Sequence, residues 1–241
     1  MNAISQLQSI VDDSRHIVFF GGAGVSTESG IPDFRSTDGL YHQEYRYPPE
    51  TILSRTFFDR DPEEFFRFYR QKILIPGVQP NAAHWKLAEL EQAGKLQAVV
   101  TQNIDGLHQL AGSKTVYELH GSVHRNYCMH CHKFYTAEDL LAKEEIVPRC
   151  DDCGGIITPD VVLYEAGLDN DTIEGAVRAI ASADTLIVAG TSLVVYPAAG
   201  FLQYFRGEHF VLINRDPTPA DSRADLVLHE KVGEVLQQIT V

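Results

Sequence analysis

Six short apolar runs recur along the chain, and each is rich in valine, isoleucine or leucine. They are His16–Phe20, Leu96–Val100, Thr115–Leu119, Thr185–Ala189, His209–Ile213 and Asp225–Leu228. Several of the runs are continuous instead of alternating, which is typical of strands that are covered on both faces. The pattern therefore predicts the buried strands of a parallel sheet.

Helical patterns lie between these runs. Asn81 is a capping residue before the predicted helix Ala82–Gln92, and Gly94 is a stop signal after it. Three further helices are predicted: Thr172–Ala181 after Asp171, Ala198–Arg206 after Pro197, and Lys231–Ile239. Strands that alternate with helices predict an α/β fold with a doubly wound, mostly parallel, Rossmann-like sheet.

Two segments interrupt this alternation. Residues 37–80 are rich in aromatic side chains and helical in their second half, and residues 122–158 hold every cysteine. We expect both insertions to form a smaller zinc-binding and helical domain, with residues 1–36, 81–121 and 159–241 as the Rossmann-like domain. A cleft between two such domains is a common place for a ligand.

Composition and charge narrow the class of protein. The 241 residues are 44% hydrophobic, as in a globular chain, and their formal net charge is −13. Phosphate contacts need clustered lysine and arginine, so we expect neither nucleic acid nor an anionic membrane as a partner. Residues 1–15 lack the apolar core of a signal peptide.

One long uncharged stretch matches the length of a membrane span. Residues 185–205 carry no charge, but glycine, proline and polar residues interrupt them, so a buried strand, loop and helix fit better. We expect a cytoplasmic protein, where thiols stay reduced.

The four cysteines follow the spacing C-x2-C-x18-C-x2-C and are Cys128, Cys131, Cys150 and Cys153. Two such pairs are typical of four thiolates arranged around Zn²⁺, and four ligands leave no open position for catalysis. Two disulfides or four unrelated buried thiols are the alternatives. The pattern favours a structural zinc site, so the chemistry must be sought elsewhere.

The first predicted strand runs into a glycine-rich loop, residues 21–30. Glycines after a first strand let the backbone approach a pyrophosphate. Thr27 stands where a dinucleotide fingerprint has its third glycine, and the acidic residue about 20 positions later is missing, which argues against an ordinary dehydrogenase. A plain glycine turn is the alternative. Phe34 and Arg35 follow closely and could cover a ring and pair with a phosphate.

Polar residues stand at the carboxyl ends of the other predicted strands. Asn103 and Asp105 follow the second strand and His120 follows the third. Ligands of open α/β sheets bind beyond these ends, so we expect the three side chains to share one crevice. A structural histidine, a turn or a helix cap is the alternative in each case. The fourth and fifth strands end in Gly190-Thr191-Ser192 and in Asn214.

Taken together, these segments resemble the sirtuins, a family of NAD-dependent protein lysine deacylases. The matching residues are Gly22–Ser26 through Gly30–Arg35, then Thr101–His108, His120-Gly121, the four cysteines, Gly190–Ser192 and Asn214. The resemblance covers nearly the whole chain in order. It implies a deacetylase that transfers the acyl group of a modified lysine to ADP-ribose and releases nicotinamide.

The resemblance also implies roles for individual residues. His120 acts as the general base, with Asn103 as a second catalytic residue. The residues implied to bind NAD are Ala23, Gly24, Thr27, Phe34, Arg35, Gln102, Asn103, Ile104, Asp105, His120, Gly190, Thr191, Ser192, Asn214 and Val232. An imidazole with a near-neutral pKa suits proton abstraction at cellular pH.

The acylated lysine of a protein substrate is implied to enter between the domains as an added strand. Val161, Val162 and Tyr164 lie in the segment that would pair with it, although Tyr164–Gly167 departs from the family's usual Phe-Gly-Glu. Tyr69 and Lys72 fall where acidic-acyl sirtuins carry tyrosine and arginine. Lysine lacks the fork that fits a carboxylate, so we expect acetyl over acidic acyl groups.

Other functions remain open at this point. An NAD-dependent ADP-ribosyltransferase or NAD hydrolase would use the same bound nucleotide, and a non-catalytic NAD-sensing protein would bind it without turnover. The resemblance and the compact length favour a monomer.

Overall fold

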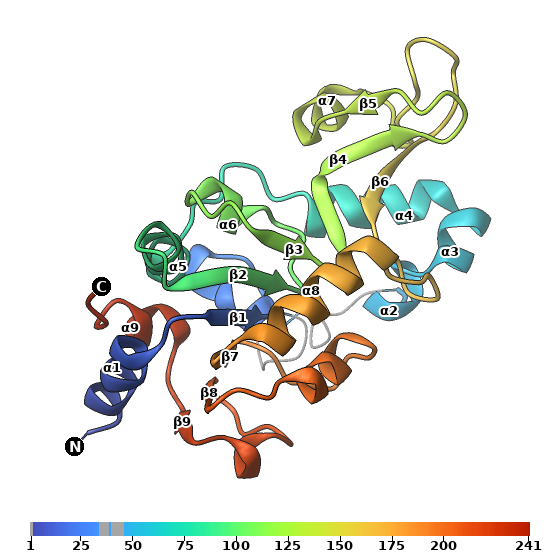
Figure 1. Cartoon of the computed structure of the whole chain (residues 1–241). Helices are drawn as coiled ribbons and strands as arrows, with labels where there is room; N and C mark the ends of the chain where they lie inside the picture. The colour runs from blue at the N-terminus through green and yellow to red at the C-terminus, as the bar shows by residue number, and fades with distance from the viewer. Residues whose placement is uncertain (1, 34–38, 40–45) are drawn as a thin grey trace.

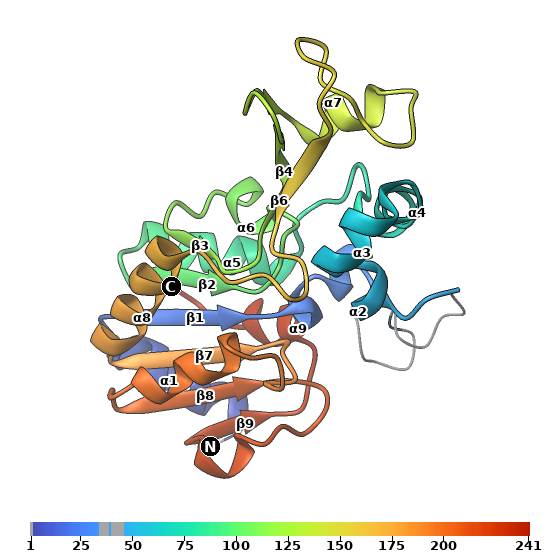
Figure 2. The same ribbon diagram turned by 90° about the vertical axis from the view of Figure 1, so that its right-hand side faces the viewer.

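The computed structural model describes residues 2–33, 39 and 46–241, and its centre is a parallel sheet of six strands. The strands are β1 (Ile17–Gly21), β2 (Leu96–Thr101), β3 (Val116–Glu118), β7 (Thr185–Ala189), β8 (His209–Ile213) and β9 (Leu226–Leu228). Their order is β3-β2-β1-β7-β8-β9, and every neighbouring pair is parallel (Figure 2). The order reverses direction between β1 and β7, which is where doubly wound sheets bind ligands.

Alternate residues of the central strands feed two separate hydrophobic layers. Phe19 packs with α1 (Ala3–Asp13), α5 (Ala82–Gln92) and α9 (Val232–Leu236) on one face. Phe20 packs with α8 (Asn170–Ser182) and the 3-10 helix Ala198–Tyr204 on the other (Figure 1). Both rings are fully buried, and each burial contributes roughly 1.5–3 kcal/mol. The continuous apolar runs of the sequence thus reflect a sheet covered on both sides.

A second, three-stranded sheet rises from one end of the first (Figure 2). Its order is β5-β4-β6, with β4 (Gly121–Cys128) antiparallel to β5 (Phe134–Tyr135) and to β6 (Ile157–Val161), and α7 (Ala137–Ala142) packs beside it. The helices α2 (Pro49–Ile52), α3 (Arg55–Arg60) and α4 (Pro62–Phe68) lie nearby, and a π-helical turn, Tyr69–Ile73, follows α4. One aromatic-rich core joins these helices to the small sheet.

The structure agrees with most predicted elements and corrects several boundaries. Asp169, not Asp171, caps α8, because its carboxylate accepts a hydrogen bond from the Thr172 N–H. The expected helix after Pro197 is a 3-10 helix, and the terminal helix is the shorter α9. The helix α1 was not predicted, and α6 (Leu107–Leu110) is a single short turn.

The uncharged stretch at 185–205 forms β7, a connecting loop and the whole of the 3-10 helix Ala198–Tyr204. Across the part of the chain that the structure describes, none of the helices combines the length and the apolar character of a bilayer span.

Gly121 marks the point where the chain leaves the large sheet for the small one. Its φ is +76°, and a Cβ atom there would lie 2.0 Å from the carbonyl oxygen of Asp160. The backbones of β4 and β6 approach so closely at this joint that only glycine fits.

We expect Gly121→Ala to lose about 1–3 kcal/mol of unfolding free energy from backbone strain alone, and more from the clash with Asp160. Gly94→Ala is the matched control, because its φ is +77° and a Cβ would meet nothing within 4 Å. Urea unfolding measures both variants. Equal losses would show that close packing at Gly121 is unimportant.

Candidate functional site

A cavity of about 1130 Å³ lies beyond the carboxyl ends of the large sheet and extends to the small sheet. Sixteen of the predicted site residues line it: Ala23, Gly24, Thr27, Gln102, Asn103, Ile104, Asp105, His120, Val161, Val162, Tyr164, Gly190, Thr191, Ser192, Asn214 and Val232. Phe34 and Arg35 lie outside the described residues. The structure thus brings these sixteen residues to one place, although they come from seven separate segments.

The glycine loop after β1 lies directly against the turn after β7. The N–H of Gly24 donates to the carbonyl of Gly190 over 2.8 Å. A Cβ on Gly22 would lie 2.8 Å from the Gly190 oxygen, and one on Gly24 would lie 2.7 Å from the Gly190 Cα. Glycine is required here because two backbones meet at the point where the strand order reverses.

Ser26 connects the glycine loop to the turn after β2. Its hydroxyl donates to the carboxylate of Asp105 over 2.6 Å and accepts a hydrogen bond from the Asn103 amide over 3.0 Å. Asn103 and Ser26 are buried, so these polar groups depend on one another as partners. The contacts fix the orientation of Asn103 and Asp105 in the cavity wall.

His120 follows β3 and hydrogen-bonds to the turn after β2. Its Nδ1 lies 2.9 Å from the carbonyl oxygen of Gln102. A carbonyl only accepts, so Nδ1 carries the proton in the neutral ring and Nε2 keeps its lone pair. Burial lowers the pKa of His120, and the bond to Gln102 opposes this shift in part. The imidazole is therefore neutral at pH 7 and can accept a proton at Nε2.

Thr191 and Asn214 form a paired contact where β7 and β8 end. The Thr191 N–H donates to the Asn214 side-chain oxygen over 2.9 Å, and the Asn214 amide donates to the Thr191 carbonyl over 2.9 Å. The amide of Gln102 reaches the Thr191 hydroxyl over 2.9 Å. Three strand ends are thus held together by side-chain hydrogen bonds.

A largely apolar wall closes the cavity next to α4. Tyr69, Ile73, Leu74 and Leu163 line it together with Lys72. Tyr69 is fully buried, its hydroxyl has no hydrogen-bond partner among the described residues, and burial raises its pKa. This wall suits an apolar group more than a charged one.

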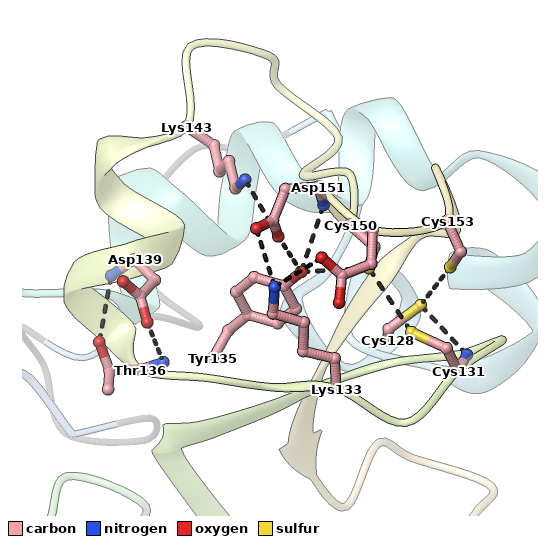
Figure 3. Close-up of polar contacts among 11 residues, drawn as sticks. Cys128, Cys131, Lys133, Tyr135, Thr136, Asp139, Lys143, Cys150, Asp151 and Cys153 are labelled. Carbon is pink, nitrogen blue, oxygen red and sulfur yellow. Dashed lines mark hydrogen bonds and ion pairs between the residues drawn. The ribbon is translucent and has the colours of Figure 1, made fainter.

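The four cysteines meet at the end of the small sheet (Figure 3). Their sulfur atoms all lie within 4.8 Å of one another, and Cys128 and Cys150 lie 3.4 and 3.6 Å from Cys153 and Cys131 respectively. Sulfurs on a tetrahedron with Zn–S bonds of about 2.3 Å are separated by about 3.8 Å. The sulfur positions fit zinc and exceed the length of a disulfide bond.

Sequence reasoning missed three residues that support the site. Ser26 lies within the glycine motif, and no local pattern indicates its role, because its position between two polar turns arises only in the fold. Asn81 caps α5 as predicted, but its amide also donates to the Val25 carbonyl over 2.8 Å and to the Ser29 hydroxyl over 3.0 Å. Glu28 accepts from the Gly233 N–H over 2.7 Å and ties the loop to α9.

The sheet order and the cavity at its switch point define an α/β protein of the nucleotide-binding class with a cysteine-rich module. A family model described as the Sir2 family matches residues 22–197. The chain therefore belongs to the Sir2 family.

Known proteins resemble the chain over nearly its whole length. A relative from Clostridium acetobutylicum, named NAD-dependent protein deacetylase, is 58% identical over 241 residues, which is 99% of this chain and 98% of the relative. A solved Sir2 structure described with a deacetylated p53 peptide and 3′-O-acetyl ADP-ribose has a TM-score of 0.91 and 40% identity, covering 98% and 97% of the two chains. Another, bound to a propionylated peptide, has a TM-score of 0.87 at 40% identity, with 98% and 97% covered.

These comparisons confirm the predicted family, the fold class and the enzyme class, an NAD-dependent protein deacetylase. They also confirm NAD as the cofactor, and the cysteine geometry agrees with the predicted zinc.

We expect Cys128→Ala to lose the bound zinc and to loosen residues 122–158, because a structural metal contributes folding free energy. Metal analysis and limited proteolysis measure the two effects. Met129→Ala is the control, since this neighbouring side chain is 42% exposed and its thioether is outside the cysteine cluster. Retention of one zinc with unchanged proteolysis in Cys128→Ala would contradict a four-cysteine site.

Proposed function

We propose that the cavity deacetylates protein lysines with the residue roles that the sequence predicts. The carboxyl ends of β1, β7 and β8, with Ala23, Gly24, Thr27, Gly190, Thr191, Ser192 and Asn214, hold the phosphates and the adenosine half of NAD, and Val232 lies beside them. Gln102, Asn103, Ile104 and Asp105 hold the nicotinamide half. The support is their convergence on one cavity at the switch point of the sheet.

NAD supplies the sugar–nicotinamide bond whose cleavage lets the acyl group pass to ADP-ribose. His120 Nε2 takes a proton from a ribose hydroxyl as general base, while Nδ1–H stays bound to the Gln102 carbonyl. The lowered pKa of His120 keeps the ring unprotonated and able to accept that proton at neutral pH. Its contact with Gln102 is the observation on which this assignment depends.

Ser26 orients the polar groups near the proposed nicotinamide site. Because its hydroxyl binds both Asn103 and Asp105, neither side chain must reorganise when a ligand enters. Preorganised groups of this kind lower the cost of reaching the reactive arrangement. The role of Asn103 in catalysis depends on this fixed orientation. By family resemblance, we also propose that Phe34 covers the reactive sugar carbon and that Arg35 pairs with a phosphate.

An acylated lysine peptide enters beside β6. This strand is the outer strand of the small sheet, and within the described residues its other edge pairs with no further strand. The N–H of Val162 donates to the His120 carbonyl over 2.9 Å, so the proposed peptide segment, with Val161 and Tyr164, lies next to the proposed base. Strand addition supplies backbone hydrogen bonds with little demand on sequence.

We also propose a cytoplasmic monomer without nucleic-acid or membrane partners, built from the two domains that the sequence predicts. The net charge of −13 supports the absence of nucleic-acid and anionic-membrane partners, since acidic chains attract polyanions weakly.

An acetyl-lysine peptide should be deacetylated only when NAD is added, with one nicotinamide released per turnover. His120→Ala should lower kcat/KM about 10²–10⁴-fold through loss of the general base. His16→Ala is the control, because this exposed residue precedes β1 at the far end of the sheet. Mass spectrometry should find acetyl-ADP-ribose. Free ADP-ribose or an ADP-ribosylated protein as the main product would favour the alternative enzymes, and NAD-independent deacetylation would refute the mechanism.

Among acyl-lysine peptides, acetyl should react with a higher kcat/KM than succinyl, since the wall around Tyr69, Ile73 and Leu74 is largely apolar. Lys72→Arg should raise the succinyl rate relative to acetyl, because a guanidinium binds a carboxylate with two hydrogen bonds. Lys86→Arg, on α5 and absent from the cavity lining, is the control. A wild-type preference for succinyl would overturn this assignment.

A further inference from the structure

Tyr135, in the short strand β5, lies between the four-cysteine cluster and an acidic loop. Its side chain is buried, with 5% of its surface exposed, in the core that also contains Cys128 and Cys150. A buried phenol needs partners for its hydroxyl, and a phenylalanine would fill the same space without that demand. The partners of this hydroxyl therefore indicate what the tyrosine does.

The hydroxyl of Tyr135 points at a cysteine sulfur (Figure 3). It lies 3.1 Å from Cys150 Sγ as a donor, also contacts the carboxylate of Asp151 as a donor, and accepts from the Asp151 N–H over 3.2 Å. One proton is thus shared between a sulfur and a carboxylate. The hydroxyl is held from two sides and cannot turn away from the metal site.

Two lysines fix the carboxylate that holds the hydroxyl. Lys133 Nζ lies 2.9 Å from Asp151 and 2.9 Å from Asp152, and Lys143 Nζ lies 3.9 Å from Asp151. Both ammonium groups also lie 5.6 Å from the centre of the Tyr135 ring. Asp151 therefore sits in a defined place beside the ring, although its own side chain is half exposed.

Both cysteine pairs receive backbone hydrogen bonds, and the second pair also receives one from a side chain. In the first pair, the N–H groups of His130 and Cys131 lie 3.4 and 3.5 Å from Cys128 Sγ. In the second pair, Cys150 receives backbone hydrogen bonds from Asp152 and Cys153, and the side chain of Tyr135 adds a further donor. Donors to a zinc-bound thiolate delocalise its charge and hold its direction, and partners of this kind affect metal affinity about 10–100-fold.

We propose that Tyr135 is a positioning residue of the zinc site, which holds Cys150 toward the metal through its hydroxyl and is itself oriented by Asp151. The proposal concerns metal retention and is independent of the residue roles proposed for deacetylation. Tyr135→Phe keeps the buried ring and removes only the hydroxyl, so the variant retains the packing of the core.

The test challenges the zinc-loaded protein with a chromophoric chelator and follows metal release. Tyr135→Phe should bind zinc about 10–100-fold more weakly than the wild type. Tyr127→Phe is the matched control: this tyrosine lies in β4 of the same small sheet, packs on Phe134, and its hydroxyl makes no contact with a cysteine among the described residues. Wild-type zinc affinity in Tyr135→Phe, or an equal loss in Tyr127→Phe, would overturn the proposal.

Cobalt-loaded protein gives a second measurement that a change in stability alone would not move. Removing a donor from one thiolate raises the energy of its lone pair, so the sulfur-to-cobalt charge-transfer band of Tyr135→Phe should shift to longer wavelength. An unchanged band in Tyr135→Phe would show that the hydroxyl does not act on the metal ligand.

Discussion

The parallel direction of the six strands determines where everything else can lie. Because every strand of the large sheet runs the same way, all of their carboxyl ends meet at one edge, which is where doubly wound sheets bind ligands. Gly24 hydrogen-bonds to Gly190 between β1 and β7, where the strand order reverses. His120 hydrogen-bonds to Gln102 at the ends of the neighbouring strands β3 and β2. The polar residues of the cavity come from distant parts of the sequence, but the direction of the strands brings them together.

The hydrogen bonds among these residues form a continuous arrangement across the cavity floor. Asn214 holds the turn at Thr191, Thr191 holds Gln102, and the carbonyl of Gln102 holds His120. Ser26 does the same for Asn103 and Asp105. The site is therefore preorganised by contacts within the protein, and burial tunes the imidazole toward its neutral form.

Much of this could be predicted from the sequence, because the strands are short apolar runs and their polar ends are motifs. The helix Ala82–Gln92 was predicted with its bounds, since Asn81 and Gly94 are local signals. Asp169 was missed as a cap because Asp171, two residues later, gives an equally good local signal. The roles of Ser26 and Tyr135 depend on partners far away in the sequence or on a loop conformation, and no local pattern reports such partners. The proposed residue roles stay predictions, and Phe34 and Arg35 fall outside the described part of the chain.

The joint at Gly121 has a mechanical consequence. The outgoing chain of β4 and the returning chain of β6 are in backbone contact there, and the bond from Val162 to His120 lies one residue beyond. A rotation of residues 122–158 about this joint would move the four cysteines much more than the residues next to Gly121. His120 and residues 161–162 lie next to this joint. Such a rotation would therefore leave the distance between the imidazole and this segment nearly unchanged.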